Sequence, residues 1–346
     1  DAAAFRRSSR SRLLYPLPPP DDRVTTDPNQ TGATLPPFNL RDSLQRLGTL
    51  GLASLVFVLL CCIAARAWWA FELFTHASTY WFLAAVALAA LLIATRAVKR
   101  AAACILLAVY FGWGAVPYLV SEENSAGSER IRVLHFNVLH NNRQHEQVAE
   151  YLTAQDADIV VIQELDPTWR KALDAVFASY PHRAVQLRHG ADGQAILSRF
   201  PLSDIGHHPE PDAEWPVLSA TATTPHGPLR LVTIHPPPPV RQHKAELRNS
   251  RLDLAARLSG GDGARLLLGD FNCTPWSPYF RELCATTGLR DAARGQGFVR
   301  TWYPTALPLG IPIDHVLHSE ELRVGGFEVG PDLGSDHRPI VVDIQF

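Results

Sequence analysis

Polar residues that could do chemistry follow several short apolar runs in residues 130–346 of this 346-residue chain. Carboxylate and amide oxygens are ligands that Mg²⁺ and Mn²⁺ prefer, and a histidine beside a carboxylate can take a proton from water. Asn and Asp also make turns and cap helices, so each residue alone has a structural explanation. A series of them at successive strand ends favours one functional site, because a rigid scaffold holds functional groups on such loops. The series comprises Asn137, Glu164, His235, Asp270, Asn272, Asp314, Asp336 and His337.

The elements that must position these residues are short strands separated by helices or by turns. That mixture favours mixed sheets with helices packed outside, rather than a purely parallel sheet. We therefore expect residues 130–346 to form one α/β (α+β) domain, a four-layer, two-sheet β-sandwich flanked by helices. The predicted strands are 131–136, 159–163, 195–197, 217–223, 229–234, 265–268, 313–317 and 339–344, and the predicted helices are 143–154, 168–178, 241–258 and 276–286.

Three apolar runs precede this domain, at 47–65, 79–95 and 101–120. Each is about the 17–25 residues that a helix needs to cross a bilayer. None shows the polar stripe of a helix at a protein surface, although buried helices of a globular domain remain the alternative. The runs predict three transmembrane helices over 47–120, and they explain why only 19% of the chain is charged.

Charge predicts the orientation of these helices. Residues 1–120 carry 11 Lys and Arg against 6 Asp and Glu, whereas residues 121–346 carry 21 against 28. Arginines in the leader and the basic group at 96–100 predict a cytoplasmic N-terminus and second loop. Three crossings then place residues 130–346 on the other side of the membrane. The proline-rich, basic residues 1–46 are predicted to be a disordered tail, and 121–129 a polar linker.

Motifs within the domain occur in the order of a known family. They are FNVL at 136–139, QEL at 163–165, GQAILSR at 193–199, TIH at 233–235, GDFN at 269–272, IDHVL at 313–317 and SDHRP at 335–339. The chain resembles the endonuclease/exonuclease/phosphatase (deoxyribonuclease-I-like) superfamily, in a membrane-anchored bacterial branch. The resemblance implies hydrolysis of a phosphate ester by an activated water, at the bacterial inner (plasma) membrane.

The resemblance also implies a metal ion and the groups around it. Glu164 and Asn137 would bind Mg²⁺, with Mn²⁺ as the alternative. Asp270 and Asn272 would lie beside the phosphate and the attacking water.

Two histidines complete the expected site. We expect His337, partnered by Asp336, to orient and deprotonate the attacking water. His235, partnered by Asp314, would contact the scissile phosphate. Whether Asp270 or His337 takes the proton stays open from the sequence.

The charge of the domain bears on the substrate. Nucleic-acid binding needs a basic surface, yet residues 121–346 have a net charge of −7 and only two lysines. Arg241, Arg248 and Arg251 could line one helix, but that helix must also bury a face. A lipid or small-molecule phosphate, diester or monoester, is therefore favoured. The alternatives are an extracytoplasmic nuclease and a non-catalytic binding domain, and a disulfide between Cys273 and Cys284 stays open.

Overall fold

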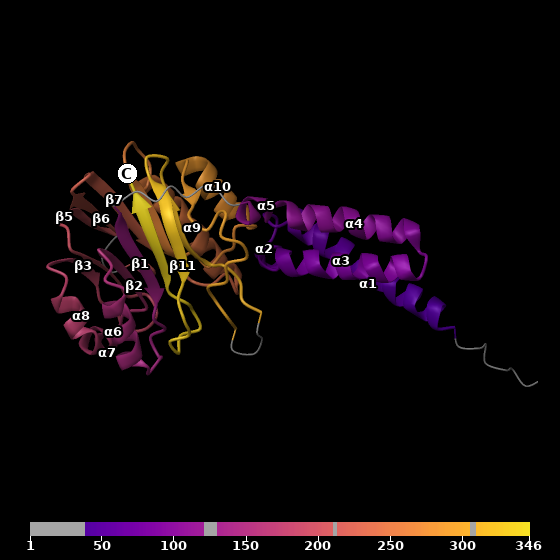
Figure 1. Cartoon of the computed structure of the whole chain (residues 1–346), viewed down its shortest axis with the longest axis horizontal. Coiled ribbons are helices and arrows are strands. Elements are labelled where there is room, and N and C mark those ends of the chain that lie inside the picture. The colour runs from indigo at the N-terminus through magenta and orange to yellow at the C-terminus, as the bar shows by residue number, and fades with distance from the viewer. Residues whose placement is uncertain (1–38, 121–129, 210–212, 305–308) are drawn as a thin grey trace, which may run out of the picture. The chain divides into compact units, whose positions relative to one another are not determined.

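The computed structural model describes residues 39–120, 130–209, 213–304 and 309–346 (Figure 1). Most of the predicted tail and all of the predicted linker, residues 121–129, lie outside these residues. Within residues 130–346 the described chain forms two six-stranded sheets.

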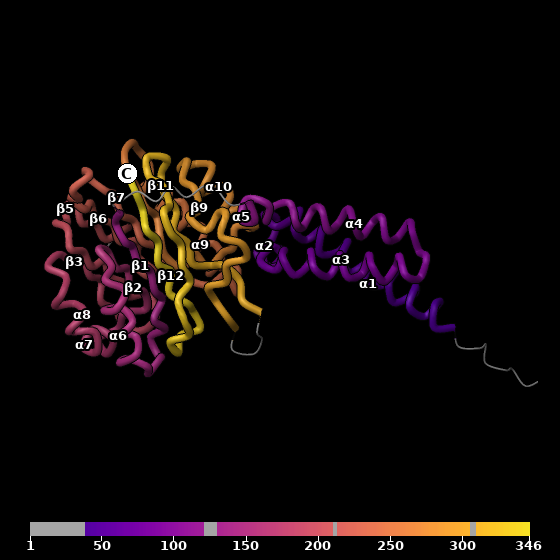
Figure 2. The backbone as a smooth tube through the Cα atoms, viewed as in Figure 1, coloured from indigo at the N-terminus to yellow at the C-terminus, as the bar shows by residue number. Residues whose placement is uncertain are grey.

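The first sheet has the order β11-β12-β1-β2-β4-β3 and the second β5-β6-β7-β8-β10-β9. Both sheets are mixed, because β1 pairs with β2 and β7 with β8 in parallel, while the other pairs are antiparallel. Figure 2 lets the reader trace β1 beside β12. The strands are β1 (Ile131–Asn137), β2 (Ile159–Gln163), β3 (His182–Gln186), β4 (Gln194–Ser198), β5 (Leu202–His208), β6 (Val217–Thr224), β7 (Gly227–Ile234), β8 (Arg265–Asp270), β9 (Arg290–Asp291), β10 (Asp314–His318), β11 (Arg323–Val329) and β12 (Ile340–Gln345).

Alternating side chains divide the core into layers. Val133 of β1 belongs to the cluster between the sheets, which also holds Leu268 of β8, whereas its neighbour Leu134 packs on the other face. That other face is covered by α6 (His145–Ala154), α7 (Pro167–Ala172) and α8 (Asp174–Ala178). The second sheet packs its outer face on α9 (Gln242–Leu258) and α10 (Pro278–Thr287). Period-two alternation in central strands thus produces the expected sandwich with flanking helices.

The four strands that the sequence did not predict are the four edge strands. They are β3 and β11 in the first sheet and β5 and β9 in the second. An edge strand is half covered and therefore needs fewer apolar residues than a central one. The sequence LSDIGHH of β5 and the glycines of RVGGFEV in β11 show this directly, and β9 has only two residues.

The apolar region before the domain is helical, but its helices differ from the three predicted spans. It contains α1 (Leu40–Ile63), α2 (Trp69–His76), α3 (Ser78–Ala94), α4 (Val98–Trp113) and α5 (Val116–Leu119). Among the described residues only α1 is long and apolar enough to cross a membrane, and α2 with α3, bent by 64°, would make a second span. Three transmembrane helices are therefore not confirmed. The helix α1 begins at Leu40, within the predicted tail, and α2 occupies what looked like a loop.

Candidate active site

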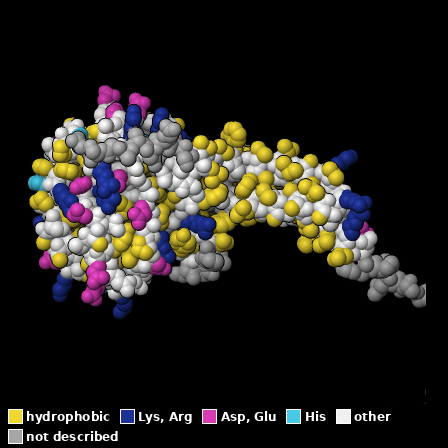
Figure 3. Space-filling model, viewed as in Figure 1, with side chains coloured by type: hydrophobic (Ala, Val, Ile, Leu, Met, Phe, Trp, Pro, Cys, Tyr) yellow, Lys and Arg dark blue, Asp and Glu magenta, His cyan; other side chains and the backbone are white. Residues whose placement is uncertain are grey.

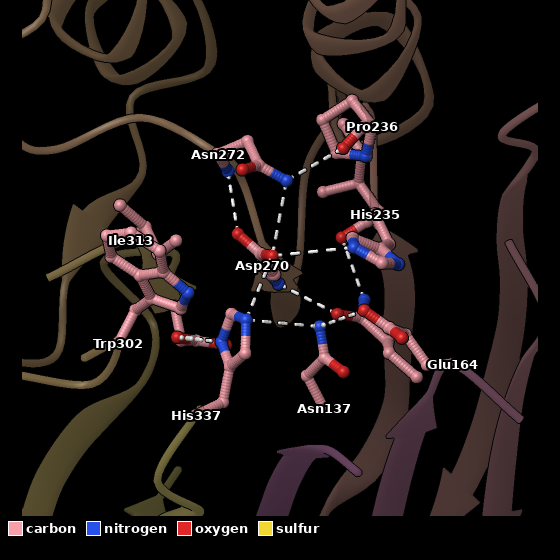
Figure 4. A network of polar contacts seen from close by, with 12 residues as sticks. Asn137, Glu164, His235, Pro236, Asp270, Asn272, Trp302, Ile313 and His337 are labelled. Atoms are coloured by element: carbon pink, nitrogen blue, oxygen red, sulfur yellow. Dashed lines mark hydrogen bonds and ion pairs between the residues drawn. The ribbon is translucent and has the colours of Figure 1, made fainter. Parts of the chain in front are cut away.

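The polar residues of the site gather where central strands of both sheets end (Figure 4). Asn137 and Asp270 are the last residues of β1 and β8, and Asp314 is the first residue of β10. Asp314 and Asp270 are direct partners across the antiparallel ladder of β10 and β8. Glu164 and His235 follow β2 and β7. The sandwich thereby brings together residues that lie far apart in the sequence.

Glu164 and Asn137 form one side of the site. The Asn137 amide nitrogen donates to Glu164 Oε1 at 3.2 Å, and Glu164 Oε2 accepts from the backbone and ring nitrogens of His140 at 2.9 and 2.7 Å. Burial disfavours the Glu164 carboxylate, but nearby His235, His140 and His337 outweigh it and keep the pKa of Glu164 below its ordinary value. The side chain therefore stays ionised. Sequence reasoning missed His140, whose only signal is its place in the turn after FNVL.

His337 contacts a different carboxylate from the one we expected. Its Nδ1 lies 2.9 Å from Oδ2 of Asp314, whereas Asp336 Oδ1 is 3.9 Å from its Nε2. Asp336 instead accepts a hydrogen bond of 2.9 Å from the Trp302 indole nitrogen. Asp336 lies in the bend before His337, and its carboxylate is directed mainly to Trp302. The structure thus makes Asp314 the closer partner of His337, and Asp336 a more distant one than predicted.

The pair of Asp314 and His337 is buried and strongly polarised. Asp314 Oδ1 also lies 3.1 Å from Nε2 of His135, a residue that the sequence did not single out. Burial disfavours both charges, but mutual attraction holds the pKa of Asp314 well below its usual range and raises that of His337 to about 10. His337 is therefore an imidazolium near neutral pH. Its Nε2 faces the Asp270 carboxylate, at 3.7 Å from Oδ2.

His235 is partnered by Asp270, not by Asp314 as predicted. Its Nε2 lies 3.4 Å from Asp270 Oδ2. Burial alone would lower the pKa of His235, but the Asp270 carboxylate, with help from Glu164, raises it. The physical reason for the correction is topology: β7 and β8 are parallel neighbours, so the residues at their ends lie side by side.

Asp270 is held by the residues around it. Its Oδ1 accepts from the Asn272 backbone at 2.8 Å, and the Asn272 side-chain amide donates to Asp270 Oδ2 at 3.2 Å and to the Pro236 carbonyl at 2.9 Å. The Asp270 backbone amide donates to Gln163 Oε1 at 2.9 Å. Gly269 precedes it with a φ of 142°, and a Cβ there would overlap the Ile234 carbonyl and the Gln163 amide. This close approach explains the glycine of GDFN.

His315 and the two cysteines of the domain lie outside this group. His315 points to the opposite face of β10, where its ring contacts the Cys273 carbonyl at 3.0 Å and Asp291 at 3.3 Å. Alternation along the strand accounts for this direction, because Asp314, its neighbour, points into the site. Cys273 and Cys284 are both free thiols.

A sequence profile of the endonuclease/exonuclease/phosphatase family matches residues 134–337, more than half of the chain. The chain belongs to that family. Its members are hydrolases of phosphate ester bonds. A comparison with curated proteins finds no match.

Solved structures of this family share the fold of the C-terminal two thirds. TDP2 from D. rerio, complexed with a single-strand DNA product, is 18% identical, with a TM-score of 0.53 over 63% of this chain and 100% of its own. The 3′ phosphatase NExo from Neisseria, bound to a product DNA hairpin, is 21% identical, with a TM-score of 0.51 over 62% of this chain and 100% of its own. Human nocturnin is 17% identical, with a TM-score of 0.51 over 63% of this chain and 94% of its own. At these identities the likeness shows the fold.

Enzymes of this family generally use a divalent metal ion, and the residues present fit one. No group of three or more His, Cys, Asp and Glu side chains suited to a metal exists in the parts of the chain that the structure describes. Mg²⁺ needs no such cage, because it keeps several waters and binds through one or two carboxylates. Glu164 offers an ionised, buried carboxylate, an oxygen ligand that suits a hard cation, and N–H groups of Asn137 and His140 hold it in place.

Proposed function

We propose that this chain is a membrane-anchored, Mg²⁺-dependent phosphoesterase that hydrolyses a phosphate ester with an activated water. The observation that carries the proposal is the convergence of Asp270, His235 and His337 beside Glu164 and Asn137 in one buried group. Such a group can bind an anion, hold a cation and accept a proton. These are the requirements of phosphoryl transfer to water.

Asp270 is the residue that we assign as the proton acceptor. It is a carboxylate whose orientation is fixed by Asn272, and it faces the two histidine rings. His337 is less suited to this role, because Asp314 keeps it protonated near neutral pH. We assign His337 and His235 to phosphate oxygens, where an imidazolium N–H stabilises developing negative charge.

Glu164 and Asn137 would hold the metal ion. When bound, the cation would neutralise charge on the phosphate oxygens. His140 contributes by fixing the Glu164 carboxylate through two hydrogen bonds, so that the ligand is oriented before the ion arrives.

Membrane anchoring by α1, α3 and α4 is the second part of the proposal. Large apolar side chains on all three helices face outward, including Phe57, Leu83 and Leu106, which are 57%, 54% and 72% exposed. Figure 3 displays hydrophobic side chains over these helices, in contrast to the charged surface of the β-sandwich. Helix α4 has only 16 residues, or about 24 Å at 1.5 Å per residue, so it would cross together with the turn and α5.

One end of these helices is basic, and this supports the orientation that we propose. Arg41 and Gln45 near the start of α1 donate to the Thr95 carbonyl at the end of α3, next to Arg96, Lys99 and Arg100. By the positive-inside rule this end lies in the cytoplasm, and the catalytic domain lies outside the bacterial inner membrane.

A lipid or small-molecule phosphate is our preferred substrate. The domain is acidic, and two arginines of α9 that could have contacted nucleic acid serve the fold: Arg248 is fully buried and Arg251 donates to the Trp215 and Glu214 carbonyls. An extracytoplasmic nuclease is the second candidate. It is favoured by the DNA products bound to the neighbouring TDP2 and NExo structures.

The test uses the purified full chain in detergent or nanodiscs with Mg²⁺. Its substrates are bis(p-nitrophenyl) phosphate, p-nitrophenyl phosphate, phospholipid vesicles and single-stranded DNA, with His337→Ala as the blank. We expect Mg²⁺-dependent hydrolysis that is faster on lipid or small-molecule phosphate than on DNA. Faster cleavage of DNA would favour the nuclease. If no substrate is hydrolysed, the result would favour a non-catalytic binding domain.

A further inference from the structure

Helix α2 carries a fully buried carboxylate into the catalytic domain. Glu72 has an exposed fraction of 0%, and its Oε1 accepts a hydrogen bond of 2.7 Å from the hydroxyl of Ser277. Its Oε2 forms a short ion pair with Arg248 of α9, whose side chain is likewise fully buried. Two charges removed from water in this way require each other, because an unpaired buried charge is strongly unfavourable.

Arg248 connects Glu72 to the residues of the site. One terminal nitrogen pairs with Glu72, and the other, Nη1, donates to the backbone carbonyl of Asn272 at 3.1 Å. Asn272 is the residue whose backbone and side chain both hold Asp270. Its φ of 48° is in the left-handed region that few non-glycine residues adopt, so the surrounding contacts must maintain it.

A second contact from α2 reaches the same loop. The ring nitrogen Nδ1 of His76, one turn after Glu72, lies 3.2 Å from the Thr274 hydroxyl and accepts from the Thr274 amide at 3.4 Å. Residues 270–277, which we call the Asp270 loop, are therefore held by α2 at Asn272 through Arg248, at Thr274 and at Ser277. Asp270 itself lies at the start of this loop.

We propose that Glu72 is a positioning residue for the reaction, which acts through Arg248 on Asn272 and so sets the orientation of Asp270. This inference rests on the phosphoesterase function proposed above. On this inference α2, one of the helices that precede the domain, helps to orient the proposed catalytic carboxylate. Hydrolysis then depends on α2 being docked on the domain, so the domain alone would be a poor enzyme.

The test compares kinetic constants of the full chain in nanodiscs on bis(p-nitrophenyl) phosphate. Glu72→Gln keeps the shape but removes the charge that orients Arg248. We expect kcat to fall about 10- to 100-fold, because a misplacement of about 1 Å costs that much. KM should stay within a factor of about two, since Glu72 does not contact substrate. Hydrogen exchange at the Thr274 and Ser277 amides should become faster.

A double variant separates positioning from stability. Glu72→Leu with Arg248→Met replaces both buried charges by apolar groups, which preserves folding where a single replacement fails. Its thermal midpoint should approach that of the wild type, but kcat should stay low because no donor reaches the Asn272 carbonyl. Recovery of kcat together with stability would show that the pair is only structural and would overturn the inference.

Arg66 and Glu282 provide the matched control. They form a second ion pair between the helices and the domain, with a nitrogen–oxygen distance of 2.7 Å, but both side chains are 53% exposed. Glu282→Gln should leave kcat and amide exchange unchanged, since exposed pairs contribute little. A wild-type kcat in Glu72→Gln would contradict the inference alone. An inactive wild-type chain would contradict the proposed function, and unaltered exchange in Glu72→Gln would still contradict the positioning.

Discussion

His337 and Asp314 are 23 residues apart in the sequence, and the Nδ1 of His337 lies 2.9 Å from the Oδ2 of Asp314. This contact fixes which ring nitrogen of His337 faces the reacting groups. It also replaces the pairing with adjacent Asp336 that the SDHRP motif suggested.

Asp314→Asn should therefore impair hydrolysis far more than Asp336→Asn. Loss of the carboxylate removes the charge that keeps His337 protonated and oriented, and we expect kcat to fall about 100-fold or more. Asp336→Asn changes a hydrogen bond to Trp302 and the longer contact to His337, and it should cost much less. Steady-state kinetics shows which of the two variants loses more kcat. A larger loss in Asp336→Asn would favour Asp336 as the partner of His337.

Removal of the metal should abolish activity, and Glu164 should set the metal requirement. EDTA should eliminate hydrolysis and added Mg²⁺ should restore it. Glu164→Gln should raise the Mg²⁺ concentration for half-maximal rate by about 10-fold or more, since even groups that only orient a metal ligand change affinity 10- to 100-fold. Glu146→Gln, on the exposed surface of α6, is the control and should need no extra Mg²⁺. Equal requirements in both variants would exclude Glu164 as the ligand.

The core between the sheets should govern stability. Leu268→Ala leaves a cavity in a site with an exposed fraction of 0% and should reduce the free energy of unfolding by about 2–5 kcal/mol. Leu187→Ala, at a side chain that is 42% exposed, should change it by less than about 1 kcal/mol. Urea denaturation monitored by tryptophan fluorescence measures both. Similar losses in the two variants would contradict the assigned layers.

Asp291 should make stability depend on acid pH. Burial opposes its charge, but the hydrogen bond and charge of His315 lower the pKa of Asp291 from its ordinary 3.8. A depressed carboxyl pKa stabilises the fold above the unfolded-state pKa, and this contribution is lost as the pH falls through the folded-state pKa. The difference in thermal midpoint between wild type and Asp291→Asn should be constant from about pH 7 to 5 and shrink below about pH 4. A difference in thermal midpoint that grows on acidification would contradict a lowered pKa of Asp291 in the folded protein.

The membrane topology predicts which side of the membrane each residue faces. Asp262→Cys, in an exposed turn of the domain, should react with a membrane-impermeant maleimide in intact cells. Lys99→Cys, in the first turn of α4, should react only after permeabilisation. The opposite pattern would place the catalytic domain in the cytoplasm.

The sequence predicted the central strands and the residues at their ends, because buried strands have strong apolar runs. It could not predict the contacts between those residues. Asp314 reaches His337 and His135 only after three segments from distant parts of the chain have come together. Glu72 was equally hidden, since a single glutamate between apolar runs is typical of a polar loop. Its burial became apparent only with Arg248 in place.

Gln163 links the two sheets of the sandwich next to the site. It ends β2 in the first sheet, yet its amide donates to the Thr233 hydroxyl at 3.0 Å and the Ile234 carbonyl at 2.8 Å in the second sheet and accepts from the Asp270 amide. The proposed metal ligands belong to the first sheet, whereas Asp270 and His235 belong to the second. A small slip of one sheet across the other would therefore separate the proposed metal ligands from the proposed proton acceptor. Gln163 fixes the register between the two halves of the sandwich at the point where the reaction requires it.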